Sequence, residues 1–303
     1  MIGGIVEIAE NGRYLSLYRG FLVVKIASEE LGRVPLDDIT ALILSAQQVS
    51  LSKNVMNALL ERKAAIITTG KNWHPSGITL PITAHHGHAG ILQHQIKLSE
   101  PRRKRLWQSI VKAKITNQKD ILILVGAAEN KIKELEILGK RVKSGDPDNM
   151  EAQASRHYWP ALMGGEFRRD RKADDHNALL NYGYTVLRAA TARYVVASGL
   201  HPALGIHHKS SVNSFALIDD LMEPFRPVID WTVCKLQTPK NELDPETKKK
   251  LVSVLTMDLK SEDEISPLVN CLGRLAQSFV HCVNGTNDKL RLPRLNIFPE
   301  VDS

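Results

Sequence analysis

Three segments from the middle of the chain onward carry side chains that could bind a metal ion. In the first, Glu151 stands near the start of a predicted helix, where a carboxylate interacts favourably with the helix dipole. The second ends in the adjacent pair His207 and His208, and imidazole is a natural ligand for first-row transition metals. The third, 219–223, reads Asp-Asp-Leu-Met-Glu, and on a helix its carboxylates would crowd one face. Such crowding favours a nearby cation.

Each segment also has a purely structural interpretation. A first-turn glutamate such as Glu151 commonly caps its helix, and paired histidines are often solvated. The acidic run could instead pair with Arg226 and surface lysines. Pro224 disfavours an unbroken helix, so a kink or a new helix start is expected at Glu223. Adjacent histidines point in different directions, so only one of the pair is expected to face a given site.

Taken together, the three segments supply two carboxylates and one imidazole. Cleaving or transferring a phosphodiester requires a nucleophilic oxygen, relief of charge at phosphorus and stabilisation of the leaving oxygen, and a divalent ion can serve all three needs. Carboxylates with one imidazole suit Mg²⁺ or Mn²⁺ better than structural Zn²⁺. The sequence contains neither a GxxxxGK[ST] nucleotide-binding segment nor a GxSxG nucleophile motif.

The positive charge of the chain is concentrated in one stretch. Lys and Arg number 40 and Asp and Glu 33, a formal net charge of +7, yet residues 1–80 are nearly neutral. Residues 101–119 contain seven basic side chains and no acid: Arg102, Arg103, Lys104, Arg105, Lys112, Lys114 and Lys119. A stretch of this kind suits a phosphate backbone, because counterion release drives binding without regard to base sequence. A solvated helix face is the alternative.

A second histidine-rich segment contains His85, His86 and His88, with His94 nearby. It is loop-like and has no carboxylate before Glu100, so a metal site is the less favoured hypothesis there. The three cysteines form no CxxC pair, which favours a reducing cytoplasm. We expect neither a signal peptide nor a membrane-spanning helix, because no stretch of about 18 apolar residues occurs.

The hydrophobic pattern predicts an α+β protein of about two domains. Residues 1–80 are expected to be a small β-rich domain, with strands at 5–8, 14–18, 21–26, 41–44 and 65–68 and one helix at 52–62. Residues 81–283 are expected to form a larger all-α domain, with helices at 102–117, 121–143, 149–163, 178–197, 215–236, 245–257 and 265–283. Residues 284–303 are predicted to be an extended or disordered tail.

The candidate residues also carry a resemblance to a known family. Segments 106–118, 151–159, 177–184, 199–208 and 220–227 resemble, in their order and spacing, the CRISPR-associated integrases that insert new spacers, in their type II form and subtype II-C. In motif, Glu151 matches the glutamate of Glu-x-x-Ala-[Ser/Ala]-Arg, and His208 matches the histidine three residues after the glycine. Glu223 matches the acid of Asp-Leu-x-Glu, where many relatives carry Asp. His207 stays open as an alternative ligand.

The resemblance implies a dimerising β-rich amino-terminal domain and a helical catalytic domain. It implies that Glu151, His208 and Glu223 bind Mg²⁺ or Mn²⁺, and that the 3′-hydroxyl of a short duplex DNA fragment attacks a phosphodiester of the repeat array. It also implies a homodimer that binds double-stranded DNA and a small companion adaptation protein, with the type II effector nuclease as a further partner. The DNA backbone would then follow a basic surface, for which the expected residues are Arg102, Arg103, Lys104, Arg105, Lys112, Arg168 and Arg169, with Arg171 and Lys172.

Two other functions remain open from the sequence. The protein could be a non-catalytic scaffold that binds duplex nucleic acid, with the acidic segment serving only structure. It could also be a metal-dependent RNase with a similar site. The fold class alone would not distinguish these functions, so the distinction depends on the site.

Overall fold

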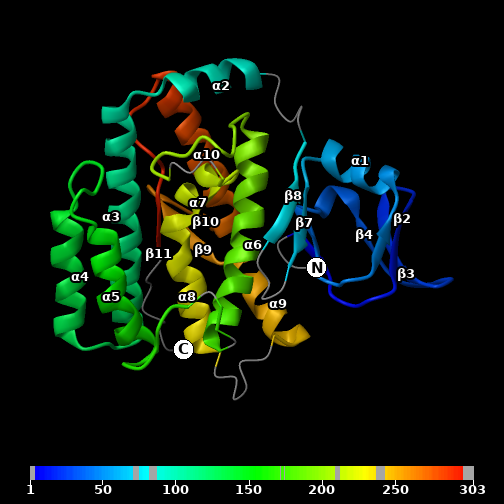
Figure 1. Ribbon diagram of the computed structural model, residues 1–303, viewed down its shortest axis with the longest axis horizontal. Helices are drawn as coiled ribbons and strands as arrows, with labels where there is room; N and C mark the ends of the chain where they lie inside the picture. Colours follow the sequence, from blue (N-terminus) through cyan, green and yellow to red (C-terminus); the bar gives the residue numbers. More distant parts are fainter. Residues whose placement is uncertain are drawn as a thin grey trace.

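The first eight strands gather at one end of the molecule and most of the helices at the other (Figure 1). The computed structural model describes residues 4–70, 75–81, 87–170, 172–173, 175–208, 212–236 and 243–295. The predicted α+β class is confirmed. Among the described residues, none of the helices is both long enough and apolar enough to cross a membrane.

The strand-rich end contains eight strands and one α-helix among the described residues. Its elements are β1 (Ile5–Ile8), β2 (Arg13–Tyr18), β3 (Phe21–Ile26), β4 (Glu29–Pro35), β5 (Ala41–Leu44), β6 (Val49–Leu51), α1 (Lys53–Glu61), β7 (Ala65–Thr69) and β8 (Pro75–Thr79). The sequence missed β4, β6 and β8. The charged strand β4 is largely exposed at a sheet edge and β6 has three residues, so neither shows a hydrophobic alternation.

The first sheet, in the order β1-β5-β7-β8, joins the two ends of the molecule. Successive side chains of a strand point to opposite faces, and here both faces are buried. Ile43 and Ile67 pack into the same core as the helices. Leu42 and Ile66 pack into a second core, shared with α1 and with the second sheet, β4-β3-β2-β6. The continuous apolar strands of this sheet follow from that double burial.

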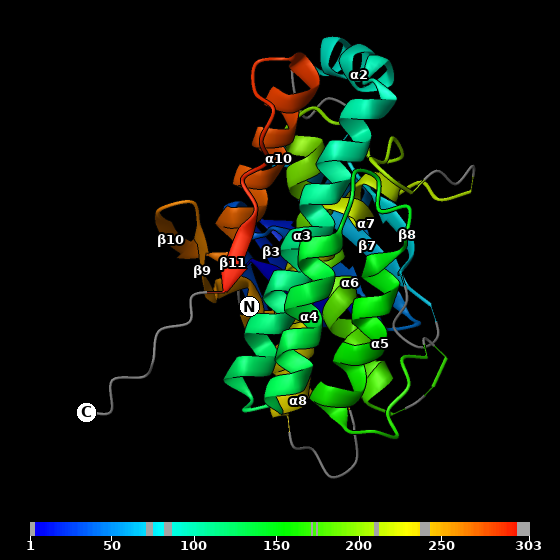
Figure 2. The same cartoon turned by 90° about the vertical axis from the view of Figure 1, so that its left-hand side faces the viewer.

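The helical end is built around α6, which lies between the first sheet and the remaining helices (Figure 1). Its elements are α2 (His88–Lys97), α3 (Glu100–Leu124), α4 (Glu129–Arg141), α5 (Met150–Met163), α6 (His176–Ala197), α7 (Ala216–Met222), α8 (Arg226–Lys235), α9 (Pro245–Ser253), β9 (Asp258–Ser261), β10 (Glu264–Pro267), α10 (Leu268–Asn284) and β11 (Pro293–Leu295). Figure 2 shows α3 running along the molecule beside α4 and α5, against which it packs.

Two predicted helix boundaries were wrong. The expected helices 102–117 and 121–143 are divided later in the chain, between Leu124 and Glu129. The break occurs where Gly126 adopts φ +67°, a left-handed conformation that ends a helix. Residues 118–120 contain no such residue, so α3 continues through them. Helix α2 was not predicted at all, since its segment is rich in histidine and only weakly amphipathic.

The expectation of an all-α carboxy-terminal domain was also wrong. Strands β9, β10 and β11 form a small antiparallel sheet there, in the order β10-β9-β11. Glu262, at φ +56°, lies in the tight turn between β9 and β10, and the helix expected from residue 265 begins only at Leu268, after Pro267. Part of the predicted tail is extended, because Pro293–Leu295 pairs with β9. Residues 296–303 lie outside the described part of the chain.

Candidate active site

The start of α5 is capped without using the side chain of Glu151. The Asp146 carboxylate accepts hydrogen bonds from the backbone N–H groups of Met150 (2.8 Å) and Glu151 (3.1 Å). The side chain of Asn149 accepts one from Ala152 N (3.3 Å). These bonds satisfy the free N–H groups of the first turn, so the capping role that a first-turn glutamate usually has is already filled. The Glu151 carboxylate is therefore available for other contacts.

Glu223 lies at the break between two helices. Helix α7 ends at Met222, a 3₁₀ turn spans Glu223–Phe225, and α8 starts at Arg226. This agrees with the interruption expected from Pro224. Asn117 of α3 donates a hydrogen bond from Nδ2 to the Pro224 carbonyl (2.8 Å), which fastens the turn to α3. The side chain of Glu223 is only 6% exposed, so its carboxylate is a buried charge.

The two glutamates meet at one ammonium group. Lys114 Nζ lies 2.5 Å from Glu151 Oε1 and 2.6 Å from Glu223 Oε2. Burial by itself would lower the pKa of Lys114, but the carboxylates of Glu223 and Glu151 outweigh it and raise that pKa above its usual value. Lys114 is therefore positively charged at neutral pH and lies between the two carboxylates. From the sequence it was grouped with the DNA-binding stretch of α3.

A second cation reaches Glu223 from α8. Arg226 Nε lies 2.9 Å from Glu223 Oε1, and the same guanidinium lies over the Tyr184 ring at 4.8 Å. Burial alone would raise the pKa of Glu223, but Arg226 and Lys114 outweigh that effect and hold the pKa below its usual value. Glu223 is accordingly ionised at neutral pH despite its burial.

His208 is oriented by the buried carboxylate of Asp220. Asp220 accepts hydrogen bonds from the backbone N–H groups of Ile206 (2.6 Å) and His207 (2.9 Å), and its Oδ1 contacts His208 Nδ1. This contact raises the pKa of His208. It also occupies Nδ1, which leaves Nε2 as the ring nitrogen that could face a ligand. A carboxylate behind an imidazole is the arrangement that commonly fixes metal-binding histidines.

His207 is placed differently. Its ring is stacked on Trp107, with centroids 4.3 Å apart and planes at 4°. His208 meets the same indole edge-on, at 81°. Of the two histidines, only His208 lines the cavity that also contains Lys114, Glu151 and Glu223. The geometry therefore favours His208 over His207 as the side chain that faces the glutamates.

The side chains do not form a ready-made metal cluster. Within the described residues, no group of three or more His, Cys, Asp or Glu side chains is close enough to hold an ion. The carboxylates nevertheless fit a cation. Glu223 Oε2 is buried, and its contact with the Lys114 ammonium at 2.6 Å is an ion pair that is poorly aligned as a hydrogen bond. Two carboxylate oxygens and one imidazole nitrogen are also a donor set that divalent magnesium or manganese accepts.

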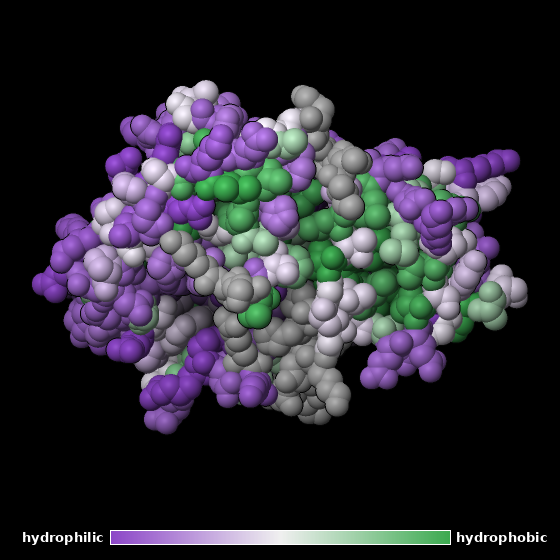
Figure 3. Space-filling view, turned by 45° about the horizontal axis from the view of Figure 1, so that its top comes forward, coloured by the Kyte–Doolittle hydropathy of each residue, from purple (hydrophilic) through white to green (hydrophobic). Residues whose placement is uncertain are grey.

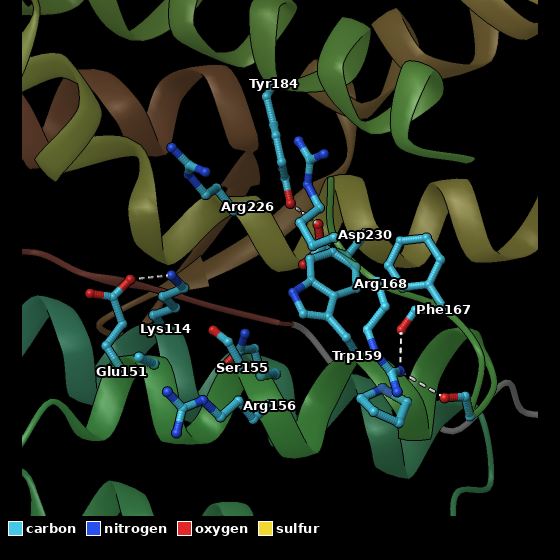
Figure 4. Close-up of a pocket in the computed structure, with 15 residues that line it drawn as sticks. Lys114, Glu151, Ser155, Arg156, Trp159, Phe167, Arg168, Tyr184, Arg226 and Asp230 are labelled. Carbon is cyan, nitrogen blue, oxygen red and sulfur yellow. Dashed lines mark hydrogen bonds and ion pairs between the residues drawn. The ribbon is translucent and has the colours of Figure 1, made fainter. Parts of the chain in front are cut away.

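The site lies between two cavities that share several lining residues. One, of about 370 Å³, contains His208 and Asp219, and the other, of about 680 Å³, contains Trp159 and Arg168. Both are lined by Lys114, Glu151, Arg169, Tyr184 and Arg226. Figure 4 shows the larger cavity, with Lys114 and Glu151 on one side and Trp159, Phe167 and Arg168 on the other. The candidate ligands thus border an open space with a strongly cationic wall.

The predicted DNA-binding residues fall into two groups. Arg103 donates to the carbonyls of Leu98 and Gly205, at 3.1 and 2.9 Å, and Arg102 is paired with Asp288. The guanidinium groups of Arg102 and Arg103 therefore bind acceptors within the protein. Of the other predicted residues that the structure describes, Lys104, Arg105, Lys112 and Lys172 are exposed. Arg168 and Arg169 line a cavity and also donate within the protein, Arg168 to the Gly165 and Phe167 carbonyls and Arg169 to the side chains of Asn177 and Asn181.

The histidine-rich loop does not form a site in the described residues. His88 Nδ1 contacts the Gly199 carbonyl (2.9 Å) and His94 Nδ1 contacts Asn284 Oδ1 (2.7 Å). His85, His86 and Arg171 lie outside the described residues.

Several residues of the site escaped the sequence analysis. Lys114 was grouped with the DNA-binding stretch of α3, and Asp220 was expected to be part of an acidic face. Arg226 was considered only as the partner of that face. Asp230, which accepts a hydrogen bond from Tyr184, was not considered. One feature of the sequence could have identified Lys114 as a buried cation: it stands in a predicted helix between the apolar residues Ala113 and Ile115.

Comparison with known proteins gives consistent matches. A sequence model of the family described as "CRISPR associated protein Cas1" matches residues 6–259. A "CRISPR-associated endonuclease Cas1" of Neisseria meningitidis serogroup C (strain 8013) is 38% identical over 293 residues, which cover 95% of each chain. A second relative, from Pyrobaculum aerophilum, is 26% identical over 76% of this chain and 82% of its own length.

Solved structures share the fold at low sequence identity. A CAS1 protein from Thermotoga maritima has a TM-score of 0.76 at 15% identity and covers 98% of this chain and 100% of its own. A casposase bound to integration product has a TM-score of 0.77 at 19% identity, with 94% and 92% coverage. A chain of a Cas6-RT-Cas1–Cas2 complex has a TM-score of 0.78 at 18% identity, and 36% of that chain is covered. At these identities the likeness shows the fold alone.

Proposed function

The chain belongs to the family of CRISPR-associated Cas1 proteins, and from this premise we propose that it is a metal-dependent DNA endonuclease and integrase of CRISPR adaptation. The observation that carries the proposal is the convergence of Glu151 and Glu223 on one cation, with His208 lining the same cavity. The similarity to the Neisseria relative supports the type II, subtype II-C assignment. The casposase bound to integration product supports integrase chemistry on this fold.

Glu151, His208 and Glu223 would hold Mg²⁺ or Mn²⁺, which would supply charge relief at phosphorus and activate the attacking oxygen. The chain's own residues complete the site. Asp220 keeps the His208 ring in one orientation through Nδ1. The Tyr184 ring packs beneath Arg226, which keeps the guanidinium at the cavity wall.

The cationic wall would hold the phosphate that reacts. Arg169 and Arg226 line both cavities beside the glutamates, and Arg168 lines the larger one. Guanidinium groups bind phosphate oxygens with a fixed, planar geometry. When the attacking group is the 3′-hydroxyl of a DNA fragment, the result is strand transfer. When it is water, the result is cleavage.

Duplex DNA would approach the site along the exposed side of α3. Lys104, Arg105 and Lys112 are exposed there, and Lys112 shares a cavity of about 690 Å³ with Lys140, Arg141 and Lys143. The last three were not part of the predicted DNA-binding set. Contacts of this kind position a duplex without reading its bases. Figure 3 shows that hydrophilic residues dominate the end of the molecule away from the strands.

Dimerisation is proposed for the strand-rich end. Large apolar side chains of β2, β3 and β4 are exposed there, namely Tyr14, Leu17, Tyr18, Ile26 and Leu31. In Figure 3 hydrophobic residues gather toward the same end of the molecule. Exposed apolar patches are typical of protein interfaces. The division into a dimerising domain 1–80 and a catalytic domain 81–283 belongs to this proposal.

The remaining partners are a small companion adaptation protein and the type II effector nuclease, with the cytoplasm as the setting. A complex that contains Cas1 and Cas2 has been solved for a protein of the same fold, which supports the companion. The three free cysteines are consistent with a reducing compartment.

The test is strand transfer by purified protein on a labelled duplex in Mn²⁺. Glu151→Ala and His208→Ala are expected to reduce transfer and cleavage to background, with duplex binding largely retained. Glu129→Ala is the matched control, since Glu129 is an exposed first-turn glutamate of α4. Full activity in either site variant would contradict the site assignment. His207→Ala separates the two histidines, because it leaves the His208–Asp220 contact in place.

The same assay distinguishes the alternatives. A scaffold would bind the duplex and show no metal-dependent transfer or cleavage in the unmodified protein. An RNase would cleave a matched RNA substrate in Mn²⁺ in preference to DNA. Either result would replace the proposed function.

A further inference from the structure

The Lys114 ammonium lies between the two candidate carboxylate ligands. Both Glu151 Oε1 and Glu223 Oε2 are within 2.6 Å of its nitrogen. Magnesium binds carboxylate oxygens at about 2.1 Å, so each oxygen would need to move by only about half an ångström to bind an ion at the same place. The ammonium thus stands where a bridging metal ion would stand.

Charge balance disfavours the simultaneous presence of the Lys114 ammonium and a metal ion between the two glutamates. Glu151 and Glu223 carry two negative charges, and Lys114 and Arg226 carry two positive charges within ion-pair distance. A divalent ion added to this set would leave an excess of positive charge in a buried place. Uncompensated buried charge is costly, because the surrounding protein screens it less than water does. The ion therefore binds most favourably when one of the cations moves away.

Lys114 is the cation better suited to leave. Arg226 is packed over Tyr184, whereas lysine carries a point charge on a flexible four-carbon stem. Lys114 also lines both cavities, so open space lies within reach of its side chain.

We propose that Lys114 is an exchangeable counter-cation of the metal site. In the metal-free protein it keeps the carboxylates of Glu151 and Glu223 together. When the ion binds, the ammonium moves into the larger cavity, beside Ser155 and Arg168, where it adds to the positive charge that a DNA phosphate would meet. This inference rests on the proposed function, because it requires that Glu151 and Glu223 bind the ion.

The first experiment measures Mn²⁺ binding by calorimetry in the Lys114→Met variant, which removes the charge and keeps an unbranched side chain. Its affinity is expected to be about tenfold higher or more, since one competing charge is gone. The thermal midpoint of the metal-free variant should fall, and its rise on adding Mn²⁺ should exceed that of the unmodified protein. Lys133→Met is the matched control, because Lys133 is exposed on α4. Its Mn²⁺ affinity should not change.

The second experiment uses the unmodified chain, so that it stands even when the variant folds poorly. Amine-reactive labelling followed by mass spectrometry should find Lys114 protected without metal and labelled more rapidly at saturating Mg²⁺. Unchanged protection of Lys114, or unchanged Mn²⁺ affinity in a folded Lys114→Met variant, would overturn the exchange. Absence of Mn²⁺ binding by the unmodified protein would overturn the metal-binding part of the proposed function together with this inference. If the exchange fails but the unmodified protein binds Mn²⁺ and Glu151→Gln abolishes that binding, the proposed metal site still holds and only the exchange of Lys114 is overturned.

Discussion

Two clusters of largely buried charged side chains in this protein are similar in composition and differ in how completely their polar atoms are hydrogen-bonded. The junction cluster, at the contact between β1 and the helices, consists of Glu7, Ser45, Tyr182 and Lys248. Glu7 accepts hydrogen bonds from Ser45 Oγ (2.5 Å), Tyr182 Oη (2.6 Å) and Lys248 Nζ (3.0 Å). Ser45 follows β5, Tyr182 is on α6 and Lys248 is on α9, so one carboxylate ties β1 to both helices.

The site cluster consists of Lys114, Glu151, Glu223 and Arg226. It has more charge and poorer hydrogen bonding, since the ion pairs of Glu223 Oε2 with Lys114 and of Arg226 Nε with Glu223 Oε1 are close in distance but poorly aligned as hydrogen bonds. A fully satisfied buried network rigidifies a fold, whereas a partly satisfied one is costly and is typical of functional sites. The contrast indicates that the junction cluster serves stability and the site cluster serves binding.

The largest effect is expected beside the site cluster, at the buried carboxylate of Asp230. Burial raises its pKa from 3.8 to about 7, even though Tyr184 donates a hydrogen bond to it. A raised carboxyl pKa means that Asp230 favours the fold when protonated, and that this contribution is lost as the pH rises from about 4 through 7. Asp230→Asn should therefore be more stable than the unmodified protein at pH 8, by up to about 4 kcal/mol.

Urea unfolding at pH 5, 6.5 and 8 measures this difference. The gain should shrink toward acid pH, where both side chains are neutral. A gain in unfolding free energy that does not depend on pH would show that the variant acts through packing. The ionised Asp230 carboxylate would then not be a source of instability beside the site cluster.

The next effect tests the junction cluster. Glu7→Ala leaves the Lys248 ammonium and the Tyr182 hydroxyl without their carboxylate, and loss of one member of a largely buried pair costs about 3 kcal/mol. Denaturant unfolding should show this loss, while Mn²⁺ affinity in the folded protein stays unchanged. Glu10→Ala is the control, because the Glu10 side chain is 73% exposed in its pair with Arg13. A change in metal affinity would break the division between the two clusters.

The smallest effect concerns the orientation of His208. Asp220→Asn replaces one acceptor oxygen by an amide donor that would face backbone N–H groups, so the loop and the imidazole should lose their fixed geometry. Mn²⁺ affinity is expected to fall by about 10- to 100-fold, as for other carboxylates that hold metal-binding histidines. Asp219→Asn is the neighbouring control, since Asp219 pairs with Arg188. Equal effects of the two substitutions would argue against a role for Asp220 in placing His208.

Local sequence signals predicted much of the fold. Strand β3 has the predicted bounds and helix α5 begins one residue later than predicted, because alternation and capping residues act over a few positions. Helix α2 and the sheet β10-β9-β11 were missed, since their segments are short and are stabilised by contacts with distant elements. The candidate residues Glu151, His208 and Glu223 were named through family motifs, and residue types alone favoured none of them over a structural role.

By itself the sequence determined strands such as β3, the helix start before Glu151 and the interruption at Pro224. These are properties of neighbouring residues and of backbone geometry. Only the tertiary structure decided the partners. Lys114 was one of seven cations in a basic stretch, and it became the ion between Glu151 and Glu223 because α3 packs against both α5 and the turn after α7. The residue type fixes the charge of a side chain, but its role depends on which opposite charge the tertiary structure places beside it.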